Sequence, residues 1–221
     1  MTDNSLDKLF ETIRSLTGRK HPPQNLTEAR PKATFLIIGL GNPGREYRET
    51  RHNIGFLAVD QVAHRLHVKF SRTQSKALVT EGLHQGRKVI LAKPQSYMNK
   101  SGHPTRSLVR FYKIPLDQIL IIYDDVDLPF ATIRMKPSGG PGGHKGMDSV
   151  IEQLGTQAIP RLRLGIGRPP GYKQTANYVL KPFSAEEKAF LPAFLERAAN
   201  AVFTFMDEGI EQAMTQYNRN G

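Results

Sequence analysis

Hydrophobic and polar residues alternate along the chain in patterns whose length and spacing predict the secondary structure. Short apolar runs typical of β-strands occupy residues near 34–40, 77–84, 87–92, 118–123, 130–136 and 160–166. Apolar residues at helical spacing predict helices near 51–67, 97–112, 144–155 and 184–206, and a shorter one near 208–217. Strands and helices in this order favour an α/β fold, in which a mixed, twisted sheet carries helices on both faces.

Two connecting segments have a composition that predicts their conformation. Only Gln85 and Gly86 separate the runs 77–84 and 87–92, so we expect these two strands to form a β-hairpin. The segment 137–143, Pro-Ser-Gly-Gly-Pro-Gly-Gly, is typical of a mobile loop, and we expect it at the rim of the functional site.

The first 32 residues follow a different pattern from the rest. A short helical repeat contains five apolar residues, Leu6, Leu9, Phe10, Ile13 and Leu16, and a polar stretch with three prolines follows it. Three acids within the first eleven residues argue against a transit peptide. We therefore expect residues 1–32 to be an N-terminal extension, mobile or loosely docked, and residues 33–221 to form a single domain.

The composition narrows the chemistry of the protein. With 221 residues the chain is long enough to bury the core of one α/β domain. It has no cysteine, which excludes disulfides, thiol nucleophiles and cysteine-ligated zinc. No apolar run reaches the ~18 residues of a membrane-spanning helix, so we expect a soluble protein without a membrane partner.

The formal charge of +11 indicates a polyanionic partner, with nucleic acid ahead of an anionic membrane. Between residues 130 and 173, two acids accompany seven basic residues, which are Arg134, Lys136, Lys145, Arg161, Arg163, Arg168 and Lys173. Such a patch is suited to contacts with the phosphates of a nucleic acid, although a solvated surface is the alternative.

The glycines after the first strand have the spacing of a dinucleotide-binding loop, because Gly39, Gly41 and Gly44 spell G-x-G-x-x-G. Other residues argue against a nicotinamide cofactor. Pro43 removes a backbone N–H that a pyrophosphate would use, and polar residues follow Gly44 where an apolar helix should begin. The acid about 20 residues on, Asp60, falls within a helical pattern and not at the end of a second strand.

The same segment instead offers groups for ester or amide chemistry. The strand ends in a turn that presents Asn42, and the next helix begins with His52 and Asn53. An amide and an imidazole near the carboxyl end of a strand can polarise a carbonyl group and move a proton.

A second polar segment, residues 93–102, follows a strand and opens a helix. Asn99 falls in the first turn of this helix, where its amide can face a cleft. The alternative is that Ser96 or Asn99 only caps the helix.

Three acids, Asp124, Asp125 and Asp127, follow the strand near 118–123. A metal site is one interpretation, but the local sequence offers few of the ligands that a hard cation needs. The other is that one acid accepts a hydrogen bond from His52, which fixes the ring tautomer and stabilises the imidazolium. We expect Asp125 to be exposed and Asp127 to hold the turn before Pro129.

Two further segments carry groups that can bind anions. Gly142 and Gly143 lead into a helix that begins near His144, and the N-terminus of a helix favours anions and oxyanions. Arg161 and Arg163 alternate along a strand, so we expect both on one exposed face, where each can bind a phosphate.

Taken together, these segments resemble the bacterial-type peptidyl-tRNA hydrolase family over about residues 34–215. Four motifs in the expected order carry the resemblance: Gly-Leu-Gly-Asn-Pro-Gly with Thr-Arg-His-Asn at 50–53, Met-Asn-x-Ser-Gly at 98–102, the acidic block that ends in Asp-Leu-Pro at 127–129, and Gly-Gly-His at 142–144. The resemblance implies a hydrolase without metal or cofactor that cleaves the ester bond between peptide and tRNA and so recycles tRNA. It also implies a cytoplasmic monomer with no obligate protein partner.

The resemblance assigns roles to individual residues. His52 is expected to be the general base, Asp124 to orient it, and Asn42 and Asn99 to hold the substrate or water; which amide donates to the oxyanion stays open. The expected substrate-binding residues are Tyr47, Met98, His144 and Lys145. The expected tRNA phosphate-binding residues are Arg134, Lys136 and Arg163.

The chain departs from the family at one of these positions, where Lys145 replaces the usual Asn after the second His. An ammonium group donates hydrogen bonds but accepts none, so Lys145 does not replace an amide that accepts from the peptide. It can instead bind a phosphate near the end of the tRNA.

Two alternatives remain at this point. One is a serine nucleophile, for which Ser96 and Ser101 are the nearest candidates, although neither lies in a Gly-x-Ser-x-Gly motif. The other is a non-catalytic RNA-binding protein of the same fold, of the organellar splicing-factor type.

Overall fold

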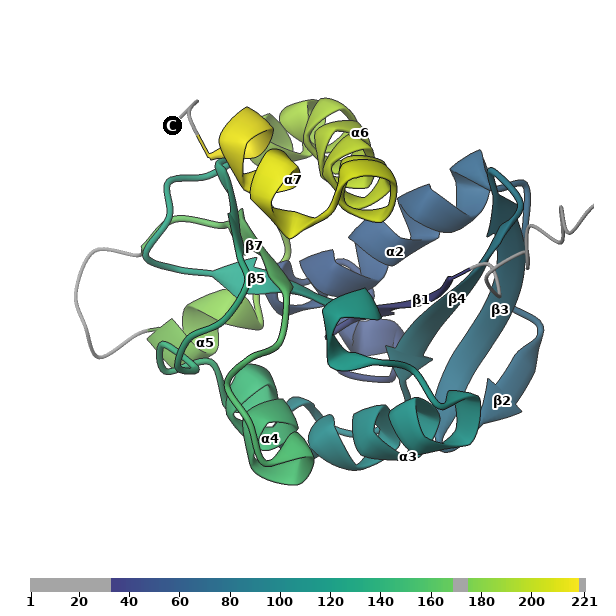
Figure 1. Cartoon of the computed structure of the whole chain (residues 1–221). Helices are drawn as coiled ribbons and strands as arrows, with labels where there is room; N and C mark the ends of the chain where they lie inside the picture. Colours follow the sequence, from purple (N-terminus) through teal and green to yellow (C-terminus); the bar gives the residue numbers. More distant parts are fainter. Residues whose placement is uncertain (1–32, 169–174, 219–221) are drawn as a thin grey trace, which may run out of the picture. The chain divides into compact units, whose positions relative to one another are not determined.

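The structure is a computed structural model that describes residues 33–168 and 175–218. Within these residues, seven strands form one sheet in the order β2-β3-β4-β1-β5-β7-β6 (Figure 1). The strands are β1 (Thr34–Gly39), β2 (Arg72–Gln74), β3 (Ala77–His84), β4 (Arg87–Pro94), β5 (Ile119–Asp125), β6 (Ile133–Lys136) and β7 (Arg161–Gly165). The helices are α2 (Ile54–Arg65), α3 (Gly102–Tyr112), α4 (Lys145–Leu154), α5 (Thr175–Val179), α6 (Ala185–Glu208) and α7 (Ile210–Tyr217). Short 3₁₀ turns are η1 (Arg45–Tyr47), η2 (Arg51–Asn53), η3 (Met98–Lys100) and η4 (Leu116–Gln118).

The sheet is mixed. β1 lies between β4 and β5 and is parallel to both, and β5 is parallel to β7. β6 is antiparallel to β7, while β3 pairs with β4 from Ala77↔Pro94 to His84↔Arg87, which confirms the predicted hairpin. The carboxyl ends of the parallel strands lie at one edge, where ligands of open α/β sheets bind.

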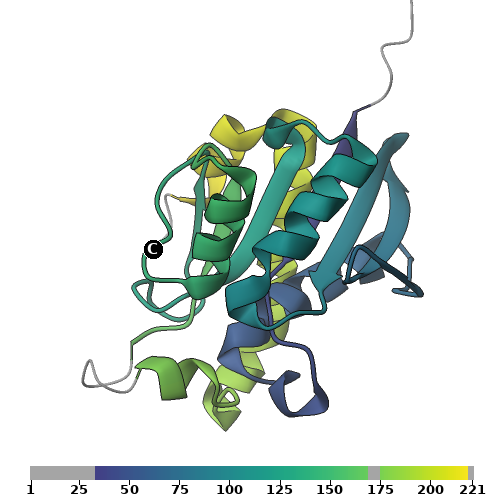
Figure 2. The same ribbon diagram turned by 90° about the horizontal axis from the view of Figure 1, so that it is seen from below.

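Helices cover both faces of the sheet, as predicted. Helices α2, α6 and α7 lie on one face, and α3 and α4 lie side by side on the other (Figures 1 and 2). The first face buries an apolar layer that includes Ile37, Val59 and Phe205, and the second buries one that includes Ile38 and Leu108. Ile37 and Ile38, neighbours on β1, belong to different layers because successive side chains of a strand point to opposite faces.

Two elements were not predicted. β2 consists of Arg72, Thr73 and Gln74 at the edge of the sheet, so no apolar run marks it. α5 spans only five residues, too few for a helical repeat to show in the sequence. The expected N-terminal extension, residues 1–32, lies outside the described residues and stays a prediction.

Glycines of the first motif allow β1 and α2 to approach each other closely. A Cβ atom on Gly39 would lie 2.1 Å from the carbonyl oxygen of Gly55, and one on Gly55 would lie 2.4 Å from that of Ile122. Both distances are shorter than any van der Waals contact, so only glycine fits at these positions. Gly39 therefore has a packing role, because it allows the start of α2 to pack closely against the ends of β1 and β5.

Candidate active site

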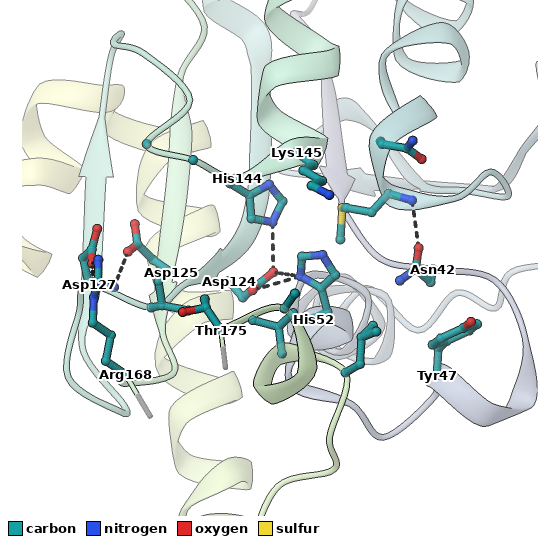
Figure 3. Close-up of a pocket in the computed structure, with 18 of the residues that line it drawn as sticks. Asn42, Tyr47, His52, Asp124, Asp125, Asp127, His144, Lys145, Arg168 and Thr175 are labelled. Carbon is teal, nitrogen blue, oxygen red and sulfur yellow. Dashed lines mark hydrogen bonds and ion pairs between the residues drawn. The ribbon is translucent and has the colours of Figure 1, made fainter. Parts of the chain in front are cut away.

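His52 and Asp124 meet at the carboxyl end of the sheet although 72 positions separate them in the chain (Figure 3). His52 lies in η2, at the start of α2, and Asp124 lies near the end of β5. Nδ1 of His52 lies 2.8 Å from Oδ1 of Asp124 and 3.0 Å from Oδ2. The carboxylate is buried, with 2% of the residue exposed.

A second imidazole shares the same carboxylate. Nε2 of His144 lies 3.0 Å from Oδ1 of Asp124. Nδ1 of His144 accepts a hydrogen bond from the backbone N–H of Met147 at 3.1 Å, so His144 is the N-cap of α4. Because Nδ1 accepts, the ring proton is on Nε2, and His144 donates it to Asp124.

Asp124 is ionised in this arrangement. Burial alone would raise the pKa of its carboxyl group, but charge interactions with His52 and His144 and hydrogen bonds from both rings outweigh burial. They hold the pKa of Asp124 well below its ordinary value. An ionised carboxylate only accepts, so Nδ1 of His52 carries a proton and donates it. Nε2 of His52 is then left with a free lone pair, which a general base requires.

Asn42 is held in one orientation by two other residues. Its Oδ1 accepts from the backbone N–H of Met98 at 2.8 Å. Asn53 accepts from the backbone N–H of Asn42 at 2.8 Å and donates to its carbonyl oxygen at 2.9 Å. With Oδ1 occupied, the Nδ2 amino group of Asn42 is the atom left to donate. Asn53 has a positioning role that the sequence did not reveal, although the residue stands within the first motif.

The expected catalytic and substrate-binding residues line one cavity of about 680 Å³. They are Asn42, Tyr47, His52, Met98, Asn99, Asp124, His144 and Lys145. Residues of and just after α5, Thr175, Ala176, Val179 and Leu180, form a further wall that the sequence did not predict. Tyr97 also lines the cavity and exposes 61% of its surface.

Neither alternative role of the segment 93–102 fits the structure. The capping alternative is wrong: Ser96 Oγ donates to the carbonyl oxygen of Lys100 at 3.1 Å, and no side chain caps the start of α3. Asn99 is exposed in the cavity and caps nothing. Ser101 is fully buried and neither it nor Ser96 lines the cavity, which removes the serine-nucleophile alternative.

Asp124 and Asp125 at the end of β5 and Asp127 just after it do not converge on one point, because each pairs with different residues, so the metal interpretation for these three acids is wrong. Asp125 is not exposed as expected, because it is half-buried and pairs with Nε of Arg163 at 2.5 Å. Asp125, rather than Asp127, holds the turn, since its Oδ1 accepts from the backbone N–H of Asp127 at 2.9 Å. Asp127 pairs with Arg168.

A different set of residues could hold a metal ion. In residues 33–168 and 175–218, one group has this spacing: the ligand atoms of His52, Asp124 and His144 all lie within 4.8 Å of one another. Both rings are hydrogen-bonded to the carboxylate between them. The carboxylate that would bind a metal is therefore already hydrogen-bonded to both imidazole rings.

The expected phosphate-binding residues lie on β6 and β7, and one of them, Arg163, pairs with Asp125, which lines the cavity. Arg134 on β6 stands opposite Arg163 on β7, and Lys136 stands opposite Arg161. The expectation that Arg161 is exposed is wrong, since it exposes only 1% of its surface. Lys173 lies outside the described residues.

Arg161 instead holds the glycine-rich loop, residues 137–143. Its Nη1 donates to the carbonyl oxygens of Gly139 at 2.7 Å and Gly140 at 3.1 Å, and its Nη2 donates to that of Gln157 at 2.9 Å. Gly142 and Gly143 line the cavity, which confirms the expected position of the loop at its rim. The mobility of the loop stays a prediction.

The described helices include none that is long and apolar enough to cross a membrane. A family model described as peptidyl-tRNA hydrolase matches residues 36–221. A peptidyl-tRNA hydrolase from Chloroflexus aggregans is 49% identical over 185 residues, which are 83% of this chain and 98% of the relative. One from Carboxydothermus hydrogenoformans is 47% identical over 187 residues, 85% of this chain and all of the relative. The crystal structure of peptidyl-tRNA hydrolase from Acinetobacter baumannii superposes with a TM-score of 0.80 at 33% identity, and covers 86% of this chain and 97% of that one.

Proposed function

The chain belongs to the peptidyl-tRNA hydrolase family and hydrolyses the ester bond between peptide and tRNA, and we propose that His52 is the general base of this reaction. One observation carries the proposal: His52 lies in the cavity with its Nδ1 on the buried, ionised Asp124. All four expected catalytic residues line the cavity, namely Asn42, His52, Asn99 and Asp124. Their presence together favours an enzyme over an RNA-binding protein of the same fold.

The first step transfers a proton from water. A water molecule beside Nε2 of His52 gives its proton to this atom while its oxygen attacks the carbonyl carbon of the ester. Asp124 stabilises the imidazolium that forms. Asn42 donates from Nδ2 to the negative oxygen of the tetrahedral intermediate, an interaction that contributes a few kcal/mol in comparable sites. Asn99 holds the attacking water or the substrate.

The second step breaks the bond to the ribose. The tetrahedral intermediate collapses, the C–O bond to the terminal ribose breaks, and His52 returns the proton to the departing ribose oxygen. The products are a peptide with a free carboxyl group and a tRNA with a free terminal hydroxyl. His52 and Asp124 regain their starting protonation states.

The rest of the cavity binds the two halves of the substrate. Tyr47 and Met98 contact the peptide side, and His144 holds Asp124 in place. Lys145, which is exposed at the mouth of the cavity, binds a phosphate near the tRNA end. Arg134, Lys136 and Arg163 bind phosphates further along the tRNA, a role that their positions on the neighbouring strands β6 and β7 favour. We further propose that the protein acts as a monomer in the cytoplasm.

The test is a turnover assay with N-acetylated aminoacyl-tRNA. We expect the wild type to release tRNA and His52→Ala to lose turnover while it keeps nearly the wild-type affinity for uncharged tRNA. Retained turnover in His52→Ala would show that another group is the base. Absent turnover in the wild type with intact tRNA binding would overturn the enzymatic function itself.

A further inference from the structure

Helix α3 presents a row of basic side chains to solvent, separate from the basic residues of β6 and β7. We call it the α3 stripe, and it consists of Lys100, His103, Arg106, Arg110 and Lys113, all of them exposed. The helix itself, Gly102–Tyr112, contains no acid. None of the five side chains forms an ion pair or hydrogen bond with another residue in the part of the chain that the structure describes.

The spacing aligns these charges along one face. Successive members of the α3 stripe are all three or four positions apart, which places neighbouring side chains above one another on a helix. At about 1.5 Å per residue, Arg106 and Arg110 are about 6 Å apart along the axis and the whole stripe extends over roughly 20 Å. The opposite face of α3 packs into the core through Leu108.

The α3 stripe is not explained by the stability of the helix. Arg106 and Arg110 carry like charges four residues apart, which destabilises a helix. Lys100 and His103 lie at the N-terminal end, where the helix dipole disfavours positive charge. Only Arg110 and Lys113, near the C-terminal end, interact favourably with the dipole. Most of the stripe therefore lowers the stability of the helix, an effect that a polyanionic partner would reduce.

The α3 stripe begins at the mouth of the active-site cavity. Lys100 directly follows Asn99, and Tyr97, Met98 and Asn99 all line the cavity. Both ends of the stripe carry an exposed aromatic ring, since Tyr97 exposes 61% of its surface and Phe111 exposes 59%. Cations along a track with aromatic rings beside it are typical of surfaces that bind a nucleic-acid strand.

The basic residues of β7 and the α3 stripe lie on the same side of the sheet. Tyr123 belongs to the same apolar layer as α3 and α4, and it pairs in register with Arg163 on β7. Arg163 therefore faces the side on which α3 lies. Helix α4 carries two exposed acids, Asp148 and Glu152, so the α3 stripe and the basic residues of β6 and β7 remain two separate surfaces.

We propose that the α3 stripe is a second RNA-binding surface, which holds the phosphate backbone of the tRNA beyond its terminal nucleotide. The inference rests on the proposed function, because it takes the substrate's RNA as the occupant. An anionic lipid surface fits less well, since α3 packs its apolar face into the core through Leu108 and leaves only one large apolar side chain exposed, that of Phe111. The RNA that leaves the cavity is the polyanion nearest to the stripe.

The first experiment measures binding of uncharged tRNA over a range of salt concentrations. The test variant is Arg106→Ala with Arg110→Ala, a change that favours helix formation and so preserves the fold. The control is Arg65→Ala with Lys69→Ala, which removes two charges at and just after the end of α2, on the other face of the sheet. We expect the test variant to bind roughly tenfold more weakly and to lose about two units of salt slope, and the control to change little.

The second experiment compares two substrates. We expect the test variant to raise KM for full-length peptidyl-tRNA with kcat unchanged, and to cleave a peptidyl ester of adenosine as fast as the wild type. Equal effects of test and control variants on tRNA would overturn the proposal, as would equal losses on both substrates. It would also be overturned if only binding to phosphatidylserine vesicles fell. Weaker tRNA binding by the test variant in a protein that lacks turnover would support the α3 stripe and refute the proposed function instead.

Discussion

Oδ1 of Asn42 accepts a hydrogen bond from the backbone N–H of Met98 at 2.8 Å, across 56 positions of the chain. The bond joins the loop after β1 to η3 and leaves only the amino group of Asn42 to face the cavity. Asn99, by contrast, is exposed. The sequence left open which amide donates to the oxyanion, and this bond favours Asn42.

Substitution of Asn42 by Asp tests that assignment with almost no change in shape. The carboxylate still accepts from Met98 but places a negative oxygen where the amino group stood, so it repels the oxyanion. We expect kcat to fall about 10²- to 10³-fold with little change in KM. Asn99→Asp is the matched control and should change KM more than kcat. Steady-state kinetics with N-acetylated aminoacyl-tRNA measures both, and a kcat that falls more in Asn99→Asp would reverse the assignment.

The two hydrogen bonds to Asp124 predict the effect of Asp124→Asn. An Asn that turns its amino group toward His52 forces Nδ1 to accept, which moves the ring proton to Nε2. The base is then blocked, so we expect kcat to fall by about 10³- to 10⁴-fold. Affinity for uncharged tRNA should stay at the wild-type value. A kcat within tenfold of the wild type would show that Asp124 does not set the tautomer.

The low pKa of Asp124 predicts how stability changes in acid. Its pKa in the folded protein lies well below the ordinary value of about 3.9, so the unfolded chain binds more protons between these two values. The contribution of Asp124 is therefore fully present above about pH 5 and declines as the pH falls through 3.9 toward the folded-state pKa. We expect the difference in unfolding free energy between the wild type and Asp124→Asn to shrink from pH 5 to pH 3. Urea unfolding of both proteins at each pH measures it, and a constant difference would contradict the ionised state.

The sequence predicted most of the fold and the lining of the site, but not how side chains hold one another. Strand and helix periods indicated the sheet, and the resemblance placed His52 near Asp124. The orientation of Asn42 depends on Asn53 and Met98, which no local pattern connects to it. Residues 161–164 alternate basic and apolar side chains, a pattern that predicts one exposed face of the strand. The burial of Arg161 arises because the loop 137–143 covers that face, and this is a tertiary effect.

The guanidinium group of Arg161 holds the loop that leads into His144. In Arg161→Lys a single ammonium cannot reach the carbonyl oxygens of Gly139, Gly140 and Gln157 together, so buried acceptors lose their donors. We expect the free energy of unfolding to fall by about 3 kcal/mol, as measured by urea denaturation. The control is Arg163→Lys, two positions further along the same strand, where the side chain forms a partly exposed ion pair with Asp125. We expect this variant to lose less than about 1 kcal/mol of unfolding free energy but to bind tRNA more weakly. If both variants lost the same stability, Arg161 would not be the residue that holds the loop.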